Sequence, residues 1–295
     1  MKAVIGIDAA GAYEPALRLF ARLKFPNAES HLINVADLVM PYTSFGVPPA
    51  LEATNQFVEG LRQAGECAVK EARCIAKTYG LTCESAVIAG PSVLTILDEA
   101  DNLGADLISV ASTRKGAFAT IFTGSMSRSI VSSSRHSILV AKEGVKIDGP
   151  VECLLATDHS TYADRAIDQF LALKPAGISK IHVVTAFDIS NKETEILYAD
   201  LPELEGHIDQ WIEGKLAEKS KALVGKLSQH GYMSDYTLKQ GNPNSVIADE
   251  MTRTNSEMLI LGAQGHGFLD RLFVGSVSFH QLVAEPYSVL IMRPR

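Results

Sequence analysis

Short apolar runs alternate with longer amphipathic stretches along the whole chain. Residues 3–7 form such a run, and the stretch up to residue 20 then carries apolar residues three or four positions apart. A short apolar run bounded by polar residues predicts a buried strand, and a spacing of three to four predicts a helix with one buried face. A chain that repeats strand and helix in this order is typical of a parallel α/β sheet.

The same order of predicted elements occurs twice. Residues 2–20 (KAVIGIDAAGAYEPALRLF) align with residues 152–170 (ECLLATDHSTYADRAIDQF), and residues 122–142 (FTGSMSRSIVSSSRHSILVAK) align with residues 273–293 (FVGSVSFHQLVAEPYSVLIMR). The segment EGVKIDGP between the copies has the glycine, aspartate and proline of a linker. We therefore predict two tandem domains, 1–143 and 151–295, each a doubly wound parallel sheet of five strands.

A glycine-rich segment, GAQGHGFLDRLFVGS, follows the fourth predicted strand of the second half. Gly262 and Gly265 would let the main chain approach a sugar and its phosphates without a Cβ clash. Gly275 precedes Ser276, which opens the next predicted helix and which we expect to act also as its N-cap. The N-terminus of that helix would attract an anion. The main-chain amides of Val277 and Ser278, the next two residues of that helix, would also face the anion.

Asp158 ends the first predicted strand of the second half. In a doubly wound sheet, ligands bind outside the carboxyl ends of the strands, where the strand order reverses. Asp158 and the glycine-rich segment would then flank one crevice, with the carboxylate accepting a hydrogen bond from a base or a ribose. A simpler role for Asp158, capping the helix near Thr161, remains open.

The spacing of Gly262, Gly265, Gly275 and Ser276 resembles the nucleotide signature of the universal stress protein family, and the resemblance extends over the whole chain as two copies. It implies the adenine nucleotide alpha hydrolase-like fold with strand order 3-2-1-4-5, the fifth strands pairing the two domains. It also implies that the chain binds ATP, with a need for Mg²⁺ left open. Asp158 would bind adenine, the main chain of Val183 would contact the adenine edge, and the glycine loop with Ser276 would hold ribose and phosphates.

The first half departs from that signature. Ala111 and Arg114 stand where the second half has Gly262 and Gly265, so the loop has lost both early glycines. Arg114 could contact a phosphate or fill the crevice, and we expect a weak or empty first site. The residues that would form it are Asp8, Val35, Gly124 and Ser125.

Composition narrows the classes of function. The formal net charge is −7 and no long run of Lys or Arg occurs, which speaks against a nucleic-acid partner. No 18-residue apolar run and no signal-peptide pattern occurs, so we expect no membrane association and a cytoplasmic protein. The four cysteines form no metal-binding pattern, and we expect no metal site.

Three functions stay open at this point. The first is a nucleotide-binding stress protein that regulates or protects and is not an enzyme, although slow ATP hydrolysis or autophosphorylation is not excluded. The second is an ATP-using enzyme, which the missing Walker A motif and the missing nucleophile–base pattern disfavour. The third is a ligand-free scaffold. In each case the last strands, SILVAK and SVLIMR, would pair the domains into a pseudo-dimer, and a homodimer is expected. We expect His182, on an apolar strand, to be structural, and leave His159 open.

Overall fold

The computed structural model describes residues 1–37, 51–112, 124–188, 207–264 and 274–294. Gly265 and Arg114 lie outside these residues. The elements of the first half are β1 (Lys2–Ile7), α1 (Glu14–Leu23), β2 (Glu29–Ala36), α2 (Leu51–Thr78), β3 (Cys83–Ala89), α3 (Ser92–Leu103), β4 (Leu107–Ser112), α4 (Ser125–Ser133) and β5 (Ser137–Lys142). Those of the second half are β6 (Val151–Ala156), α5 (Thr161–Leu173), β7 (Ile178–Phe187), α7 (Ile208–Gln229), β8 (Met233–Gln240), α8 (Pro243–Thr254), β9 (Met258–Gly262), α9 (Ser276–Ala284) and β10 (Ser288–Met292).

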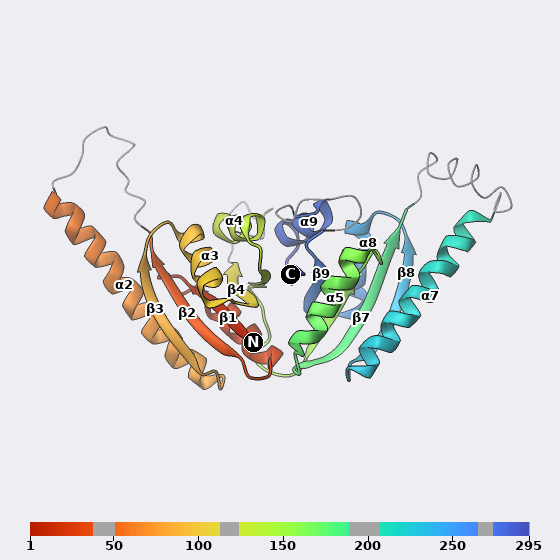
Figure 1. Ribbon diagram of the computed structural model, residues 1–295, viewed down its shortest axis with the longest axis horizontal. Helices are drawn as coiled ribbons and strands as arrows, with labels where there is room; N and C mark the ends of the chain where they lie inside the picture. Colours follow the sequence, from red (N-terminus) through yellow and green to blue (C-terminus); the bar gives the residue numbers. More distant parts are fainter. Residues whose placement is uncertain (38–50, 113–123, 189–206, 265–273, 295) are drawn as a thin grey trace.

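The strands form one ten-stranded sheet in the order β3-β2-β1-β4-β5-β10-β9-β6-β7-β8. Each half has the predicted order 3-2-1-4-5, and its strands pair in parallel. The halves meet where β5 and β10 pair antiparallel, with Leu139 opposite Leu290. The predicted α/β fold is therefore confirmed, and the two five-stranded sheets are continuous. Figure 1 shows the halves on either side of this junction, with α2 and α7 at the outer flanks.

Two apolar layers cover the two faces of the sheet. Neighbouring strand residues point to opposite faces, so Ile5 packs with the layer that includes α1, α2, α5 and α7, while Val4 packs with α3, α4, α8 and α9. Both layers contain residues of both halves, because apolar side chains of β5 and β10 contribute to each. This double burial accounts for the apolar strands of the sequence, since a parallel sheet is covered by helices on both faces.

Contacts beyond the paired strands also join the halves. Arg22, at the end of α1, is buried and forms an ion pair with Glu257 of the second half at 2.6 Å. Its guanidinium also donates to the carbonyls of Gly149 and Pro150, at 3.1 and 3.0 Å. The segment 143–150 connects β5 to β6, and the domain limits 1–143 and 151–295 stay predictions.

In the described parts of the chain, no helix is long and apolar enough to cross a membrane.

Candidate functional site

A pocket of about 250 Å³ opens at the carboxyl ends of β6, β7 and β9. From β6 the chain proceeds outward to β7 and β8, whereas β9 and β10 lie on the other side of β6. The pocket therefore lies where the strand order reverses, as expected for this type of sheet. Its walls also include the first turn of α8 and the start of α9. The predicted site residues that line it are Asp158, Gly262, Gly275, Ser276, Val277 and Ser278.

Val183 is not among the described residues that line the pocket. Its side chain is fully buried on the opposite face of the sheet, and its main chain lies in the middle of β7, between Leu155 and Tyr236. Val184 and Ala186 line the pocket instead, because alternate residues of a strand share a face. The structure thus places Val184 and Ala186 at the pocket, the second of them nearer the carboxyl end of β7.

The turn after β6 directs Asp158 to the pocket. Its Oδ1 accepts the Ser160 N–H at 3.0 Å, which holds the turn closed. The N-cap of α5 is Ser160, whose hydroxyl oxygen accepts the Ala163 N–H at 3.2 Å. The capping role that the sequence left open for Asp158 therefore belongs to Ser160.

His159 is a structural residue of the same turn. It has a left-handed φ of 53° and a buried side chain. Its Nε2 lies 3.0 Å from the Ser220 hydroxyl of α7 and 3.1 Å from the Thr185 hydroxyl of β7. Burial, reinforced by the charge of Lys219, lowers the pKa of His159 and favours the neutral ring. These bonds fix the main chain that carries Asp158.

The start of α9 faces the pocket from the other side. Gly275 is the N-cap and Ser276 the first helical residue, so the expectation that Ser276 is an N-cap was wrong. The Gly275 N–H donates to Ala263 O at 2.7 Å, and the Ser278 hydroxyl donates to Gly262 O at 2.8 Å. These two bonds join α9 to the end of β9. The first amides of a helix have no partner within it and form a site for anions.

Gly262 lies against an aromatic ring. A Cβ at this position would lie 3.2 Å from Cε1 of Tyr162, closer than is comfortable for two carbons. In the first half the residues aligned with Gly262 and Tyr162 are Ala111 and Ala12. The glycine of the second half thus leaves room for the Tyr162 ring.

The first half repeats part of the arrangement. The Ser127 hydroxyl donates to Ala111 O at 3.2 Å, as Ser278 does to Gly262. Asp8 follows β1, and its Oδ1 accepts the Ala12 N–H at 2.7 Å. The other predicted residues of the weak first site are at the end of β2 (Val35) and at the start of α4 (Gly124 and Ser125). Whether this half binds a nucleotide stays a prediction.

The comparison with known families gives two matches on this chain. The model described as "Universal stress protein family" matches residues 1–142 and again residues 152–293. The chain belongs to the universal stress protein family. The resemblance inferred from the glycine spacing is thereby confirmed, and so is the tandem arrangement of two copies.

Individual relatives agree with this assignment. The universal stress protein Sll1388 of Synechocystis sp. (strain ATCC 27184 / PCC 6803 / Kazusa) is 24% identical over 147 residues, which cover 48% of this chain and 96% of the relative. Among solved structures, a universal stress protein from Archaeoglobus fulgidus DSM 4304 matches with a TM-score of 0.69 and 17% identity, over 100% of this chain and 98% of the other. A functionally unknown protein from Pseudomonas aeruginosa PAO1 has a TM-score of 0.62 and 12% identity, over 99% and 92%. At 17% and 12% identity, these two solved structures support the fold alone.

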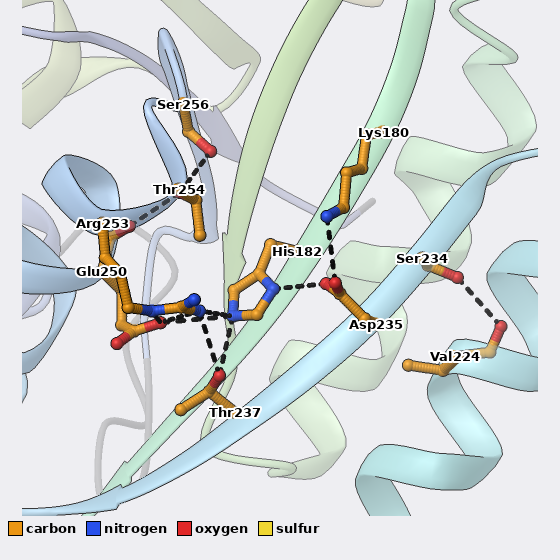
Figure 2. A network of polar contacts seen from close by, with 10 residues as sticks. All are labelled: Lys180, His182, Val224, Ser234, Asp235, Thr237, Glu250, Arg253, Thr254 and Ser256. Carbon is orange, nitrogen blue, oxygen red and sulfur yellow. Dashed lines mark hydrogen bonds and ion pairs between the residues drawn. The ribbon is translucent and has the colours of Figure 1, made fainter.

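A polar cluster supports α8, the helix that carries Pro243 and Ile247 of the pocket wall, in this universal stress protein. Figure 2 shows that it connects α8 with β7 and β8. Its members are Lys180 and His182 of β7, Asp235, Thr237 and Lys239 of β8, and Glu250 and Arg253 of α8. All belong to the second half, and His182 is the one that its place on an apolar strand had marked in the sequence.

His182 has a structural role in this cluster. Its Nε2 lies 3.0 Å from Arg253 Nη2 and 2.9 Å from the Thr237 hydroxyl, and its Nδ1 pairs with Asp235 (Figure 2). Nε2 also lies 3.3 Å from Glu250 Oε2. Both ring nitrogens of His182 are therefore engaged by polar partners of the cluster. This agrees with the expectation that His182 is structural.

Glu250 is the buried centre of the cluster. Its side chain is 0% exposed and forms ion pairs with Arg253 at 2.6 Å and with Lys239 at 2.7 Å. Burial alone would raise the pKa of Glu250, but the hydrogen bonds and charges of Arg253 and Lys239 outweigh it and lower the pKa to about 2. Glu250 is therefore ionised at every pH at which the protein is expected to work.

This lowered pKa predicts an acid-dependent loss of stability. A carboxyl group whose pKa is lower in the folded than in the unfolded state stabilises the fold above its unfolded pKa, near 4.5. That contribution falls as the pH drops toward 2. Between about pH 5.5 and pH 3, we expect the free energy of unfolding to fall by about 2 kcal/mol more in the wild type than in the Glu250→Gln variant. Urea unfolding across this pH range measures the difference, and parallel pH profiles would contradict the assignment.

Among the described residues, no group of three or more His, Cys, Asp or Glu side chains is arranged to hold a metal ion. Cys67 and Cys74 are exposed free thiols, while Cys153 is buried in the apolar layer that covers one face of the sheet.

Proposed function

We propose that this universal stress protein binds an adenine nucleotide, ATP, in the pocket of its second half. The observation that carries the proposal is the convergence of Asp158 and the start of α9 on one pocket at the reversal of the strand order. A carboxylate suits the donors of a base or ribose, and a helix N-terminus suits phosphates. The two groups supply the two kinds of contact that a nucleotide needs.

The other walls of the pocket fit a nucleotide whose base or ribose lies at Asp158 and whose phosphates lie at the start of α9. Ala186, Pro243 and Ile247 form an apolar wall on the β7 and α8 side, which would receive the face of the adenine ring. Gly262 lines the pocket with main chain alone, which would let a ligand approach it closely. Ser276 and the first amides of α9 would hold the phosphates. In this orientation the main-chain contact that we assigned to Val183 falls to Ala186 near the carboxyl end of β7.

We propose that the nucleotide is a ligand that biases a conformation or the choice of a partner in the stress response, with hydrolysis slow or absent. Asp158 is the one ionisable side chain among the described lining residues, and the proposal assigns it to the base or ribose end. A cytoplasmic location and a homodimer belong to the same proposal. Light scattering coupled to size exclusion measures the oligomeric state.

The nucleotide content of the purified protein tests this function. We expect about one ATP or ADP per chain to be released on denaturation and identified by chromatography and mass. Two nucleotides per chain would show that the first half also binds. None released, together with no binding in a titration with Mg-ATP, would contradict the proposal and favour a ligand-free scaffold, for which the buried pairing of β5 with β10 is the supporting observation.

A further inference from the structure

Two buried cations cross the junction between the halves at equivalent positions of the internal repeat. Lys142, the last residue of β5, is 3% exposed, and its Nζ donates to Leu282 O of α9 at 2.6 Å. Arg293, which follows β10, is also 3% exposed, and its Nη2 donates to Val131 O of α4 at 2.8 Å. Lys142 aligns with Arg293 and Leu282 with Val131 in the internal repeat. Each half thus places a cation on the last turn of a helix in the other half.

The main chain repeats this relation. The Lys142 N–H donates to the Ser288 hydroxyl at 3.1 Å, and the Arg293 N–H donates to the Ser137 hydroxyl at 3.1 Å. These two serines begin β10 and β5, so the strand ends are fixed to each other in both directions. The position of Lys142 relative to α9 is therefore determined by the antiparallel pairing of β5 with β10. Figure 1 shows α4 and α9 near this junction.

We propose that Lys142 of the first half is a positioning residue for the phosphate-binding helix of the second half. The inference rests on the proposed nucleotide function. Helix α9 is nine residues long, which corresponds to about 13 Å, and its first residues line the pocket while its last turn receives Lys142. A helix this short moves as a unit, so a displacement of its C-terminus also displaces the amides at its N-terminus.

Physical chemistry favours a cation at this end of α9. The last four carbonyls of a helix have no partner within it and carry the negative end of the helix dipole. An ammonium group there satisfies one carbonyl and is compensated for its own loss of water. The N-terminal end of α9 is held within its own half, by the bond from Ser278 to Gly262 O. The last turn of α9 also has a partner within its own half, since Gln281 Nε2 donates to Asn244 O at 3.2 Å. The N-terminal end of α9 is thus fixed by its own half and the C-terminal end by both halves, so the first half contributes to the site even if its own site is empty.

Calorimetric titration of the full chain with ATP and with adenosine tests this role. We expect Lys142→Met to weaken ATP binding about tenfold, which is about 1.4 kcal/mol, because the last turn of α9 loses its bond to Lys142 and the first amides of the helix are held less firmly toward the phosphates. Adenosine, which has no phosphate for α9 to hold, should lose less than about twofold. Lys142→Arg keeps the charge and should restore ATP affinity to within about threefold of the wild type.

Arg22→Met is the matched control. This substitution removes another buried cation that joins the halves, the guanidinium that pairs with Glu257. It changes no residue of α9 and no contact of Lys142. We expect it to lower the melting temperature and to leave both affinities unchanged. Equal losses for ATP and adenosine in Lys142→Met, or the same loss of ATP affinity in Arg22→Met, would overturn the positioning role in favour of general loosening of the junction.

The failure of the nucleotide function would be recognised separately. If the wild type binds neither ligand, the proposed function is wrong, and the effect of Lys142 on α9 is read from hydrogen exchange without ligand. Lys142→Met should then accelerate exchange of the α9 amides, whereas Arg22→Met should not. Unchanged exchange in α9 would overturn the role of Lys142 as well.

Discussion

Replacement of Asp158 by alanine is expected to weaken ATP binding about thirtyfold and to leave the fold in place. A hydrogen bond to a charged group contributes about 2 kcal/mol when it is sheltered in a pocket. The variant loses the carboxylate that faces the pocket and the bond from the Ser160 N–H. Ser160 still caps α5 through the Ala163 N–H, so the helix keeps its start. Calorimetric titration with ATP, alongside circular dichroism, measures the two effects.

Asp8→Ala is the control for this variant, because Asp8 occupies the equivalent position in the first half. Its carboxylate accepts the Ala12 N–H at 2.7 Å, so its loss should cost about 1 kcal/mol of stability. ATP affinity should not change. Unchanged affinity in Asp158→Ala would remove that residue from the site. A loss in Asp8→Ala alone would place the working site in the first half.

The fold follows from the sequence because its signals are periodic and occur twice. The apolar strands of the doubly covered sheet and the three-to-four spacing of helices such as α1 and α5 recur in both halves at aligned positions. The order of strands within each half came from the family resemblance. The pairing of the last strands was expected from their apolar composition, since open apolar edges favour association. Its antiparallel direction is a finding of the structure.

The candidate site was predicted in outline and missed in detail. Asp158 and Ser276 stand at strand and helix ends, which the sequence marks, and the structure brings them to one pocket. The main-chain contact of Val183 stays a prediction, while Val184 and Ala186 line the pocket, because alternate residues of a strand share a face. The end of a strand can be estimated from a sequence to within a few residues, whereas the face of a given residue requires the exact register.

The roles of Glu250 and Lys142 could not be predicted from the sequence, because their partners are distant in the chain or depend on the fold. Glu250 is charged yet fully buried, and its ion pairs with Lys239 and Arg253 explain how a charge is tolerated there. Lys142 meets Leu282 across the junction, at a separation of 140 residues. Neither contact leaves a local pattern. The internal repeat does offer one signal, since a cation stands at both Lys142 and Arg293 at the end of an otherwise apolar strand.

Gly177→Ala is expected to destabilise the protein by about 3 kcal/mol, the upper part of the usual range for overpacking in a tight contact. Gly177 lies between α5 and β7, where its N–H donates to Leu23 O of α1 at 2.9 Å. A Cβ there would come within 1.7 Å of the Arg22 carbonyl oxygen, so the main chains of the two halves would have to move apart. The ion pair of Arg22 with Glu257 lies at the same contact and would be strained by that movement.

Gly225→Ala provides the matched control for this substitution. Gly225 lies within α7, and a Cβ there would meet nothing within 4 Å. Alanine should therefore stabilise the helix by up to about 1 kcal/mol. Urea unfolding of the two variants and the wild type measures the contrast. If Gly177→Ala were as stable as the wild type, the contact between α1 and the turn before β7 would not exist in solution, and the halves would be joined by β5 and β10 without this second point of attachment. A loss confined to Gly177→Ala would instead show that the junction depends on the close approach of two main chains, which only glycine at this position permits.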